Sequence, residues 1–417
     1  MITEIKTFKQ KFHEFNSKAA FFCGLSFMFF IPISTALMNI FILFTFIFTC
    51  FGGNLRNHFA LAWQNPVSKS AFLLFGLLLI GLSWSIADIA ESLDILKKYF
   101  ELWYIGLLIP IFNSHQRRLT GLNVFLISMG AILFGVYLIF FEIILPIELS
   151  IQGKIQYFNI DGGFASHIIT NILMAFAMFI SAHKAILSKN KMKWIYIIFF
   201  LCSSYYVLFI STGTTGQIIG ISLISLIAFQ YLGKKAAIAI PFIIIIISVF
   251  ALSNENNAIN HAINKIMVRI DKTNPNYSYD INLRPQLYVH AIKTILKDPW
   301  IGTGTGSYKA AIKAKQLDFY TRTIHLKNPH SEYLMISVQL GLVGLLAFLY
   351  IFYSQGLSAF KIKDTEQKFL AQGLIVLMLI GCIFNSLLMD SRDGHFWAFF
   401  SALLFSNLNN EKLLSFN

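Results

Sequence analysis

Apolar stretches long enough to cross a bilayer recur along this chain and limit the folds open to it more than any other feature. Two of them are centred near residues 133 and 342 and contain almost no charged residues. A helix of about 20 apolar residues crosses the ~30 Å hydrocarbon layer with every backbone hydrogen bond satisfied inside the segment. The pattern therefore predicts an all-α, polytopic membrane protein and argues against an outer-membrane barrel.

The composition agrees with this fold class. Hydrophobic residues make up 56% of the chain and charged residues 13%, whereas soluble domains contain roughly 25% charged residues. We predict about twelve spans, an even number that places both termini on one side of the membrane. Their predicted centres lie near residues 27, 44, 79, 107, 133, 174, 203, 223, 244, 342, 378 and 402.

The net charge of +13 would suggest a nucleic-acid partner for a soluble protein, but here the distribution of charge indicates topology. Short loops on the side of the termini are rich in lysine and arginine, from Lys6–Lys18 to Lys361–Lys368, and the opposite short loops are poorer. By the positive-inside rule both termini are cytoplasmic. We expect membrane lipids as neighbours and no nucleic acid.

The four cysteines fall inside apolar segments, so neither a disulfide framework nor a thiolate metal site is predicted. No histidine or cysteine cluster has the spacing of a zinc site. We therefore expect neither a metal nor another cofactor.

One loop, Ser253–Pro329, breaks the charge pattern because it is long and contains eleven lysines and arginines. Loops beyond about 60 residues translocate regardless of charge, so we predict that it is external. Helical spacing of apolar residues predicts one helix from Pro285 to just before Asp298 and a second over Tyr308–Phe319. The predicted organisation is spans one to nine in residues 1–252, the external loop in 253–330 and spans ten to twelve in 331–417.

The segment "NPHSEYLMISVQLGLVG", Asn328–Gly344, places a histidine where a span begins. We predict Asn328 as the N-cap, Pro329 as the first helical residue and His330 in the first turn. The positive end of the helix would keep the imidazole neutral and able to accept a proton, as a general base does. Alternatively, His330 only ends the span. Glu332 is the second candidate base, or it only stabilises the first turn.

Arg284, in "INLRPQLY", comes directly before the helix predicted from Pro285. A guanidinium beside a helix N-terminus gives a bidentate, permanently charged grip on phosphate oxygens. The alternative is that Arg284 is one surface arginine among the basic residues of the loop.

Two turns offer backbone N–H groups and hydroxyls. "GTGTGSY", Gly302–Tyr308, lacks the Gly-Lys-Ser/Thr ending of a nucleotide-binding loop. We predict a compact turn around Gly304, with backbone N–H groups that face an anionic ligand or only hold the turn. "STGTTGQ", Ser211–Gln217, is predicted as a tight external turn that contacts a polar substrate or merely connects two helices.

Other polar residues occur at the predicted external edges of spans, where they usually face a cavity or one another. Most of them, including those between Asp390 and His395, are expected to form structural pairs. Lys97, Lys98 and His167 are the ones that we expect to contact a substrate.

Taken together, "LRPQLYVHAIKTILKDPWIGTGTGSY" and "NPHSEYLMISVQLGLVG" resemble the signature region of the O-antigen ligase and polymerase superfamily of bacterial membrane glycosyltransferases. The resemblance is strongest over Arg284–Gly344. It includes an arginine three residues before Leu287, the "PWIGTGTGSY" turn, and His330-Ser331 followed after nine residues by Gly341. "LDILKKYFELWYIGLLIP" is similar to an early Lys-Tyr segment of the family.

The resemblance implies a GT-C-like architecture of about twelve helices with one large periplasmic catalytic loop, in the bacterial inner membrane. It implies transfer of a glycan from undecaprenyl diphosphate to an acceptor on the periplasmic face without metal or nucleotide; in the ligases the acceptor is the lipid A-core oligosaccharide. His330 would then activate the acceptor hydroxyl and Arg284 would hold the diphosphate. The substrate contacts that we expect are Lys97, Lys98, His167, Thr214, Gly304 and Glu332.

One position departs from the family pattern. Ligases commonly carry a second arginine in a "TGRTG" type of turn, and this chain has Thr214 at the corresponding place in "STGTTGQ". Either a lysine such as Lys97 or Lys98 substitutes for that arginine, or the active site differs from that of a typical ligase.

A ligase is the leading hypothesis. The alternatives are an O-antigen or exopolysaccharide polymerase, a protein oligosaccharyltransferase of the same superfamily, and a transporter of lipid-linked glycans. The chain has no internal repeat and no paired broken helices of the kind found in many transporters, which weakens the last alternative.

Overall fold

The computed structural model describes residues 2–53, 55–151, 154–235, 283–313 and 328–408. Over these residues the chain is all-α apart from one two-stranded hairpin. The first half comprises α1 (Ile2–Phe30), α2 (Thr35–Phe51), α3 (Leu55–Gln64), α4 (Pro66–Ile80), a 3₁₀ turn (Gly81–Trp84), α5 (Ile89–Lys98), α6 (Glu101–Leu108), α7 (His115–Phe140), β1 (Ile147–Ile151) and β2 (Lys154–Phe158). The second half comprises α8 (His167–Leu187), α9 (Met192–Tyr205), a π-helical turn (Tyr206–Ile210), α10 (Thr214–Leu232), α13 (Leu283–Ile295), α14 (Tyr308–Lys313), α16 (Glu332–Lys361), α17 (Thr365–Phe384) and α18 (Ser391–Phe405).

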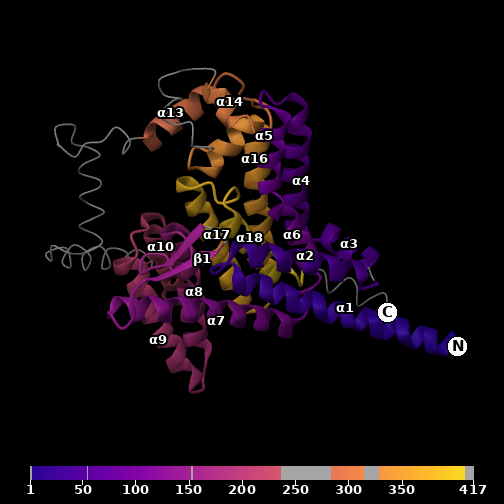
Figure 1. Ribbon diagram of the computed structural model, residues 1–417, viewed down its shortest axis with the longest axis vertical. Helices are drawn as coiled ribbons and strands as arrows, with labels where there is room; N and C mark the ends of the chain where they lie inside the picture. Colours follow the sequence, from indigo (N-terminus) through magenta and orange to yellow (C-terminus); the bar gives the residue numbers. More distant parts are fainter. Residues whose placement is uncertain (1, 54, 152–153, 236–282, 314–327, 409–417) are drawn as a thin grey trace.

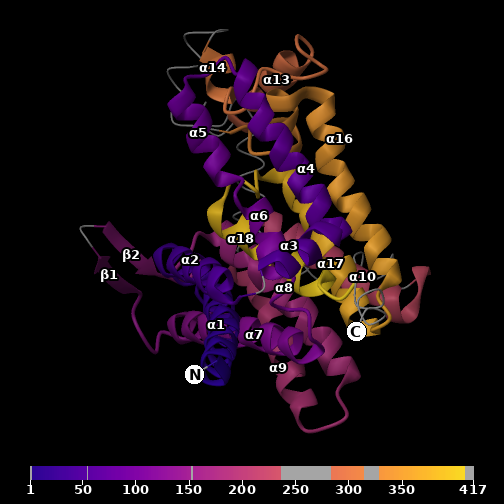
Figure 2. The same cartoon turned by 90° about the vertical axis from the view of Figure 1, so that its right-hand side faces the viewer.

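The long α16 packs against α4, and the two helices lie side by side in the half of the molecule that is uppermost in Figure 1. At one end of this pair lie α5, α13 and α14, while α9 lies at the opposite end of the molecule (Figure 2). α17 contacts α8, α10 and α16, and α18 contacts α6 and α17. This packing brings residues near 100, 330 and 390 of the sequence into one region.

Within the described residues, seven helices are long and apolar enough to cross a membrane. They correspond to the spans predicted near residues 79, 133, 174, 203, 223, 342 and 378. An eighth is obtained if α2 and α3, which meet at a 117° bend, form one broken span. The predicted number of twelve is not confirmed. α18, near the predicted centre 402, has 15 residues, fewer than the ~20 that a straight span needs, and the span predicted near residue 244 lies outside the described residues.

α8 and α18 form the buried centre of the helical assembly. In α8, 94% of the most apolar 18-residue stretch is buried, against 22% in Met192–Ile210, which is α9 with the π-helical turn, so α9 lies at the periphery. The rings of Phe176, Phe396 and Phe400 join the two central helices, with centroids 4.8 to 5.5 Å apart. Such close packing, rather than removal from water, holds apolar helices together within a bilayer.

The loop that was predicted to be external contains the helix predicted from Pro285, which is α13 and begins two residues earlier, at Leu283. The second predicted helix begins at Tyr308 as expected and is seen to Lys313. Its remaining residues lie outside the described residues. The hairpin β1–β2, in which Ile147 pairs with Phe158, was not predicted.

Candidate active site

A polar cavity of about 590 Å³ lies where the irregular segment before α16 meets the beginnings of α8 and α18 and the end of α5. It brings together three residues predicted from the sequence, namely His330, Lys97 and Lys98. The full lining is Asn39, Lys97, Lys98, Glu101, Tyr104, Ser166, Ile168, Asn328, His330, Asn385, Ser386, Met389, Asp390, Ser391, Asp393 and His395. We call this space the polar cavity.

Helix N-termini converge on the polar cavity. Ser166 is the N-cap of α8, Ser391 is the first residue of α18, and His330 directly precedes Ser331, the N-cap of α16. Each helix start carries a partial positive charge and unpaired N–H groups. Together with Lys97 and Lys98, this arrangement favours an anionic ligand such as a phosphate.

His330 does not lie in the first turn of a helix, and this corrects the sequence prediction. α16 begins at Glu332 with Ser331 as its N-cap, so Asn328 and Pro329 precede the helix. The backbone N–H of His330 donates to Oδ1 of Asn328 at 2.9 Å. This asparagine turn competes with helix formation, and His330 adopts a left-handed conformation with φ of 55°. Non-glycine residues seldom adopt that conformation, and it often occurs where function requires it.

His330 has the predicted tendency to stay neutral, for a different reason. Burial of the imidazole is the main cause that lowers its pKa, and the positive charge of Arg284 lowers the pKa further. Both effects oppose protonation of the ring. The neutral imidazole therefore predominates at pH 7, which leaves one ring nitrogen able to accept a proton.

α13 holds Arg284 beside His330. Arg284 lies in the first turn of α13 and is partly buried. One turn further on, the hydroxyl of Tyr288 lies 3.1 Å from the carbonyl oxygen of His330 and 3.0 Å from that of Ile383 in α17. Tyr288 thus fastens α13 to the His330 segment, which explains how two residues 46 positions apart in the sequence come together.

Glu332 is fully buried and does not line the polar cavity. Its Oε1 accepts from the hydroxyl of Tyr99 at 2.9 Å, and its Oε2 accepts from the N–H of Leu388 at 2.9 Å. Both oxygens are therefore occupied. Glu332 therefore connects the end of α5, the start of α16 and the loop before α18. This arrangement is typical of a structural residue and not of a substrate contact.

The "GTGTG" turn does not present free N–H groups, contrary to one of the two sequence interpretations. The N–H groups of Thr303 and Gly304 donate to the carbonyl oxygens of Val338 and Gln339 at 2.9 and 2.8 Å. Those of Thr305 and Gly306 donate to the carbonyl of Gly81 and the side chain of Gln339. Because all four groups are engaged within the protein, the turn holds α4 and α16 together and has no N–H left for an anion.

Gly341 explains the spacing of the motif around His330. It interrupts α16 with φ of 61° and ψ of −153°. The chain before the "GTGTG" turn enters this break, where the N–H groups of Leu342 and Val343 donate to the carbonyls of Pro299 and Trp300. A Cβ on Gly341 would overlap the carbonyl group of Trp300. The nine residues between Ser331 and Gly341 therefore set the distance from His330 to the point where α16 is held by Pro299 and Trp300.

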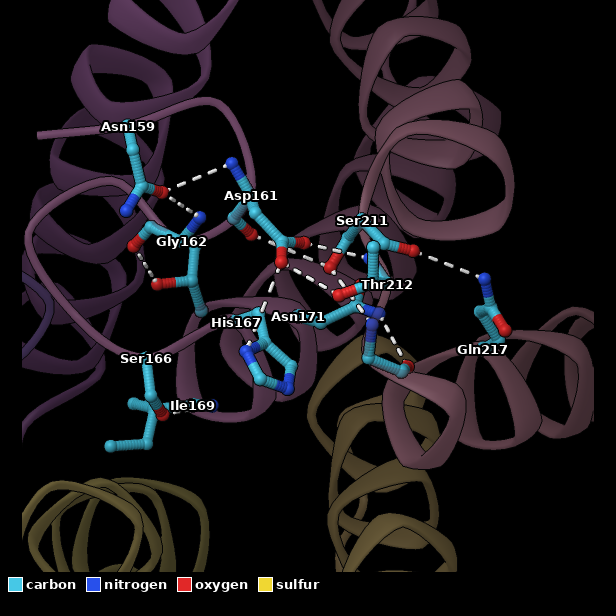
Figure 3. A network of polar contacts seen from close by, with 12 residues as sticks. Asn159, Asp161, Gly162, Ser166, His167, Ile169, Asn171, Ser211, Thr212 and Gln217 are labelled. Carbon is cyan, nitrogen blue, oxygen red and sulfur yellow. Dashed lines mark hydrogen bonds and ion pairs between the residues drawn. The ribbon is translucent and has the colours of Figure 1, made fainter. Parts of the chain in front are cut away.

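The "STGTTGQ" turn is held by Asp161 from the loop before α8 (Figure 3). The carboxylate of Asp161 accepts from the N–H and the hydroxyl of Thr212 at 2.7 and 2.6 Å. Asn171 donates to the carbonyl of Gly213 at 2.8 Å. His167, whose side chain is 45% exposed, lies 3.8 Å from the same carboxylate and does not line the polar cavity.

Thr214 is the exposed first residue of α10. It lies outside the lining of the polar cavity, but its neighbour Thr215 accepts a hydrogen bond at 3.0 Å from Asn385, which is a lining residue. Lys97 and Lys98 occupy the last turn of α5. Lys97 is exposed and pairs with Asp94 at 3.2 Å, and such surface pairs contribute little, so the pair does not prevent Lys97 from contacting a ligand.

Four cavity residues form an acidic group that the sequence did not predict as a site: Glu101, Asp390, Asp393 and His395. Nδ1 of His395 donates to the carbonyl of Ser391 and lies 3.5 Å from Oε1 of Glu101. The neighbouring Arg392 turns away and donates to Thr35 and to the carbonyls of Pro32 and Phe164.

The acidic group contains buried polar atoms that have no hydrogen-bond partner. Within the described part of the chain, Oε2 of Glu101, Oδ1 of Asp393 and Nε2 of His395 are buried and accept no hydrogen bond. Nδ1 of His395 donates to the carbonyl of Ser391, which leaves Nε2 as the ring nitrogen without a partner. Three buried polar atoms without a partner in the protein suit a ligand that carries hydroxyl groups, because a hydroxyl can both donate and accept a hydrogen bond. The segment "DSRDGH", Asp390–His395, was the sequence signal for this group. Glu101 is nearly 300 residues away from it in the sequence, so the pattern could not connect the two.

Among the described residues, no three His, Cys, Asp or Glu side chains are grouped so as to hold a metal ion. The cations that this part of the chain brings to the polar cavity are Lys97 and Lys98 in its lining and Arg284 beside His330.

Comparison with known proteins agrees with the motifs and the geometry. A family model described as O-antigen ligase matches residues 197–349, a region that includes α10, α13, α14 and the first part of α16. No curated protein matches the chain. The match contains Arg284, His330 and Gly341 but neither the lysines of α5 nor the acidic group. Residues 197–349 of this chain are therefore an O-antigen ligase family domain.

Proposed function

We propose that this protein is an inner-membrane glycosyltransferase that transfers a glycan from undecaprenyl diphosphate to the lipid A-core oligosaccharide on the periplasmic face. The observation that carries the proposal is the pairing of a neutral His330, in the polar cavity, with the guanidinium of Arg284 within an O-antigen ligase family domain. Both termini are cytoplasmic in this proposal, and residues 253–330 form the periplasmic catalytic loop between the spans in 1–252 and 331–417.

The proposed reaction has one proton transfer and one displacement at the anomeric carbon. Imidazole of His330 takes the proton of the acceptor hydroxyl as its oxygen forms a bond to the anomeric carbon. The bond from that carbon to the diphosphate oxygen breaks, and undecaprenyl diphosphate leaves with the electron pair. The proton then passes from His330 to solvent.

Positive charge stabilises the leaving diphosphate in this scheme. Arg284 provides a planar, permanently charged group for two phosphate oxygens, and Lys97 and Lys98 contribute further charge from the end of α5. Stabilisation of charge that develops in a sheltered site usually accelerates such a transfer more than any other single effect. We propose that these cations serve in place of a metal ion.

The acidic group supports the assignment of a sugar acceptor. Its buried oxygen and nitrogen atoms that lack a partner need hydrogen-bonding groups, which the hydroxyls of a saccharide supply. The cations that would hold the diphosphate lie elsewhere, at the end of α5 and in the first turn of α13. The two substrates are thus expected to occupy different parts of one cavity.

The alternative is a polymerase or oligosaccharyltransferase of the same superfamily, with the same donor and a different acceptor. Thr214 favours it, because ligases commonly carry an arginine at the corresponding place. A transporter of lipid-linked glycans is the third possibility, and a purified protein that joins such a glycan to an acceptor would dispose of it.

The test is the lipopolysaccharide of a deletion strain complemented with wild type, His330→Ala or His115→Ala. His115 is an exposed histidine at the start of α7 and lies outside the polar cavity, so it is the matched control. A ligase lesion leaves polymer on its carrier and the core bare, whereas a polymerase lesion leaves core with single repeat units. Unchanged banding from a stably inserted His330→Ala protein would refute the role of His330.

A further inference from the structure

α13 has an apolar face that the rest of the described chain does not cover. The buried side chains of α13, which pack on the protein, lie on one side of the helix. On another side, three apolar residues recur at helical spacing and are exposed, namely Val289, Ile292 and Leu296. Leu296 extends the last turn, because its N–H donates to the carbonyl of Ile292, and it is 73% exposed. The helix thus has a second apolar face besides the one that the fold buries.

Two lysines border this exposed apolar face. Lys293 and Lys297 are four residues apart, so they lie close together on the helix and the turn that follows it, away from the buried side. Both side chains are exposed. An apolar face with lysines along its edge is typical of a helix at a membrane surface, because the apolar groups enter the lipid while the ammonium groups reach the phosphates.

The turn after α13 lies where two candidate membrane spans end. The carbonyl of Ile301 accepts from Nε1 of Trp84 at 3.2 Å, and Trp84 is the last residue of the candidate span that contains α4. The carbonyl of Trp300 accepts from the N–H of Val343 in α16 at 3.1 Å. From Val343 to its end at Lys361, α16 has 19 residues, which rise roughly 30 Å, the thickness of the hydrocarbon layer. This turn therefore lies at one boundary of that layer.

The exposed side chains of the turn adjoin the apolar surface of a span. Trp300 is 68% exposed, and Ile301 is exposed as well. Leu342, whose N–H donates to the carbonyl of Pro299, and Leu346 are exposed apolar residues of the candidate span in α16. Tryptophan is enriched at the boundary between hydrocarbon and water, where its ring lies at the level of the headgroups. The position of Trp300 therefore indicates lipid, rather than a protein partner, as the neighbour of this surface.

We propose that the outer surface of α13 and of the turn after it is an anchor that binds anionic phospholipids of the adjoining membrane leaflet. We call it the lipid anchor, and its residues are Val289, Ile292, Lys293, Leu296, Lys297, Trp300 and Ile301. The anchor itself does not require the proposed function.

The consequence of the lipid anchor for transfer rests on the proposed function. α13 carries Arg284 in its first turn, and Tyr288 fastens α13 to His330. An anchored α13 would hold Arg284 at a fixed depth relative to the headgroups, where the diphosphate of a lipid donor lies.

The first measurement uses Trp300 as its own reporter in the full chain, reconstituted into nanodiscs. Phosphatidylcholine, alone or mixed with phosphatidylglycerol, carries bromine near the headgroup and quenches tryptophans in the lipid, whereas acrylamide quenches those in water. The difference between wild type and Trp300→Phe isolates the signal of Trp300. Trp194→Phe, which removes a 66% exposed tryptophan of α9, is the matched control. We expect brominated lipid to quench Trp300 and acrylamide to leave it unquenched.

Two further variants separate charge from apolar contact. Lys293→Glu combined with Lys297→Glu should lower the ratio of lipid to acrylamide quenching of Trp300 at least about fivefold in discs with phosphatidylglycerol, and much less in phosphatidylcholine alone. Leu296→Glu should lower the ratio in both compositions, and neither variant should change the signal of Trp194. A Trp300 that acrylamide quenches, or that neither quencher reaches, overturns the proposal, because the surface is then in water or covered by protein. An equal effect of the lysines in both lipids also overturns it.

Transfer in the same discs tests the consequence for Arg284. The double lysine variant should lower kcat/KM for the donor about fivefold with phosphatidylglycerol present, whereas in detergent it should equal wild type. If the quenching is as expected but wild type transfers no glycan, the lipid anchor stands and the proposed function fails. If wild type transfers and the variant equals it in the discs, the link from the lipid anchor to Arg284 is overturned.

Discussion

The His330 segment (residues 328–331) and the acidic group both line the polar cavity, yet the chain builds them in different ways. The His330 segment is an irregular connection with a left-handed residue, held by Asn328 and by Tyr288 of α13. In the acidic group, Glu101 begins α6, Asp390 directly precedes α18, and Asp393 and His395 lie near the start of α18. The first lies inside the O-antigen ligase family domain and the second outside it.

The difference suggests a division of roles. A neutral imidazole beside a permanent cation is suited to proton transfer next to a leaving anion. Carboxyl groups and a histidine with buried, unpaired polar atoms are suited to orienting hydroxyl groups, because each such atom otherwise costs about 1–3 kcal/mol. Both groups contain a histidine, so replacing each histidine tests which group supplies the base and which one binds the acceptor.

The largest effect is expected from replacing the two histidines in turn. Removal of a general base lowers kcat by about 10²–10⁴-fold, and we expect this of His330→Ala. His395→Ala should act mainly by raising KM for the acceptor. Turnover of purified protein with saturating donor and varied acceptor distinguishes the two. If His395→Ala shows the larger loss in kcat, the base is on α18 and the assignment of roles is reversed.

Gly341 offers a way to disturb the His330 segment from a distance. Gly341→Ala drives a Cβ into the Trp300 backbone and forces a left-handed alanine, so we expect a loss in stability of more than about 3 kcal/mol. Gly356→Ala is the control, because it lies in the same helix with no atom near the new Cβ. It should be neutral or stabilising by up to ~1 kcal/mol. Thermal unfolding in detergent measures both, and equal melting temperatures would contradict the role of the break.

The third prediction separates the charge of Arg284 from its geometry. Neutral His330 is the working form, so kcat/KM falls as pH falls through the pKa of His330. Arg284 lowers that pKa, so Arg284→Gln should raise the pKa and move the acid limb of the profile to higher pH. Arg284→Lys keeps the charge and should leave the limb in place, while loss of the bidentate contact lowers turnover about tenfold. An unmoved limb in Arg284→Gln would show that His330 is not the group that titrates.

Several parts of the molecule were predictable from the sequence because their signals are local. Apolar length predicted seven of the helices that can cross a membrane, and proline with helical spacing predicted α13. The lysines of α5 and His330 were predicted to lie at a substrate and do share the polar cavity. The proposed roles of these residues stay predictions.

Other parts depend on contacts that a sequence does not display. Glu101 reaches the cavity because α6 packs on α18, far away in the chain. The N–H groups of the "GTGTG" turn are occupied because the turn enters the break at Gly341. The start of α16 was placed too early because the side chain of Asn328 forms a turn instead of a helix cap. In each case a tertiary contact or a competing local hydrogen bond decided the outcome.

The smallest expected effect concerns Thr214 and the lysine that would replace the missing arginine. One lysine near an anionic lipid contributes about 1 kcal/mol, so Lys98→Ala should raise KM for the donor about fivefold. The control is Lys189→Ala, which replaces an exposed lysine between α8 and α9 and should leave KM unchanged.

A double variant that adds Thr214→Arg to Lys98→Ala then tests whether a guanidinium at the start of α10 can replace the lysine. Recovery of donor affinity would place the family's usual second arginine within reach of the diphosphate, next to Thr215 and its partner Asn385. If Lys98→Ala leaves donor KM unchanged, the lysines are not the substitute, and Arg284 alone would have to hold the diphosphate.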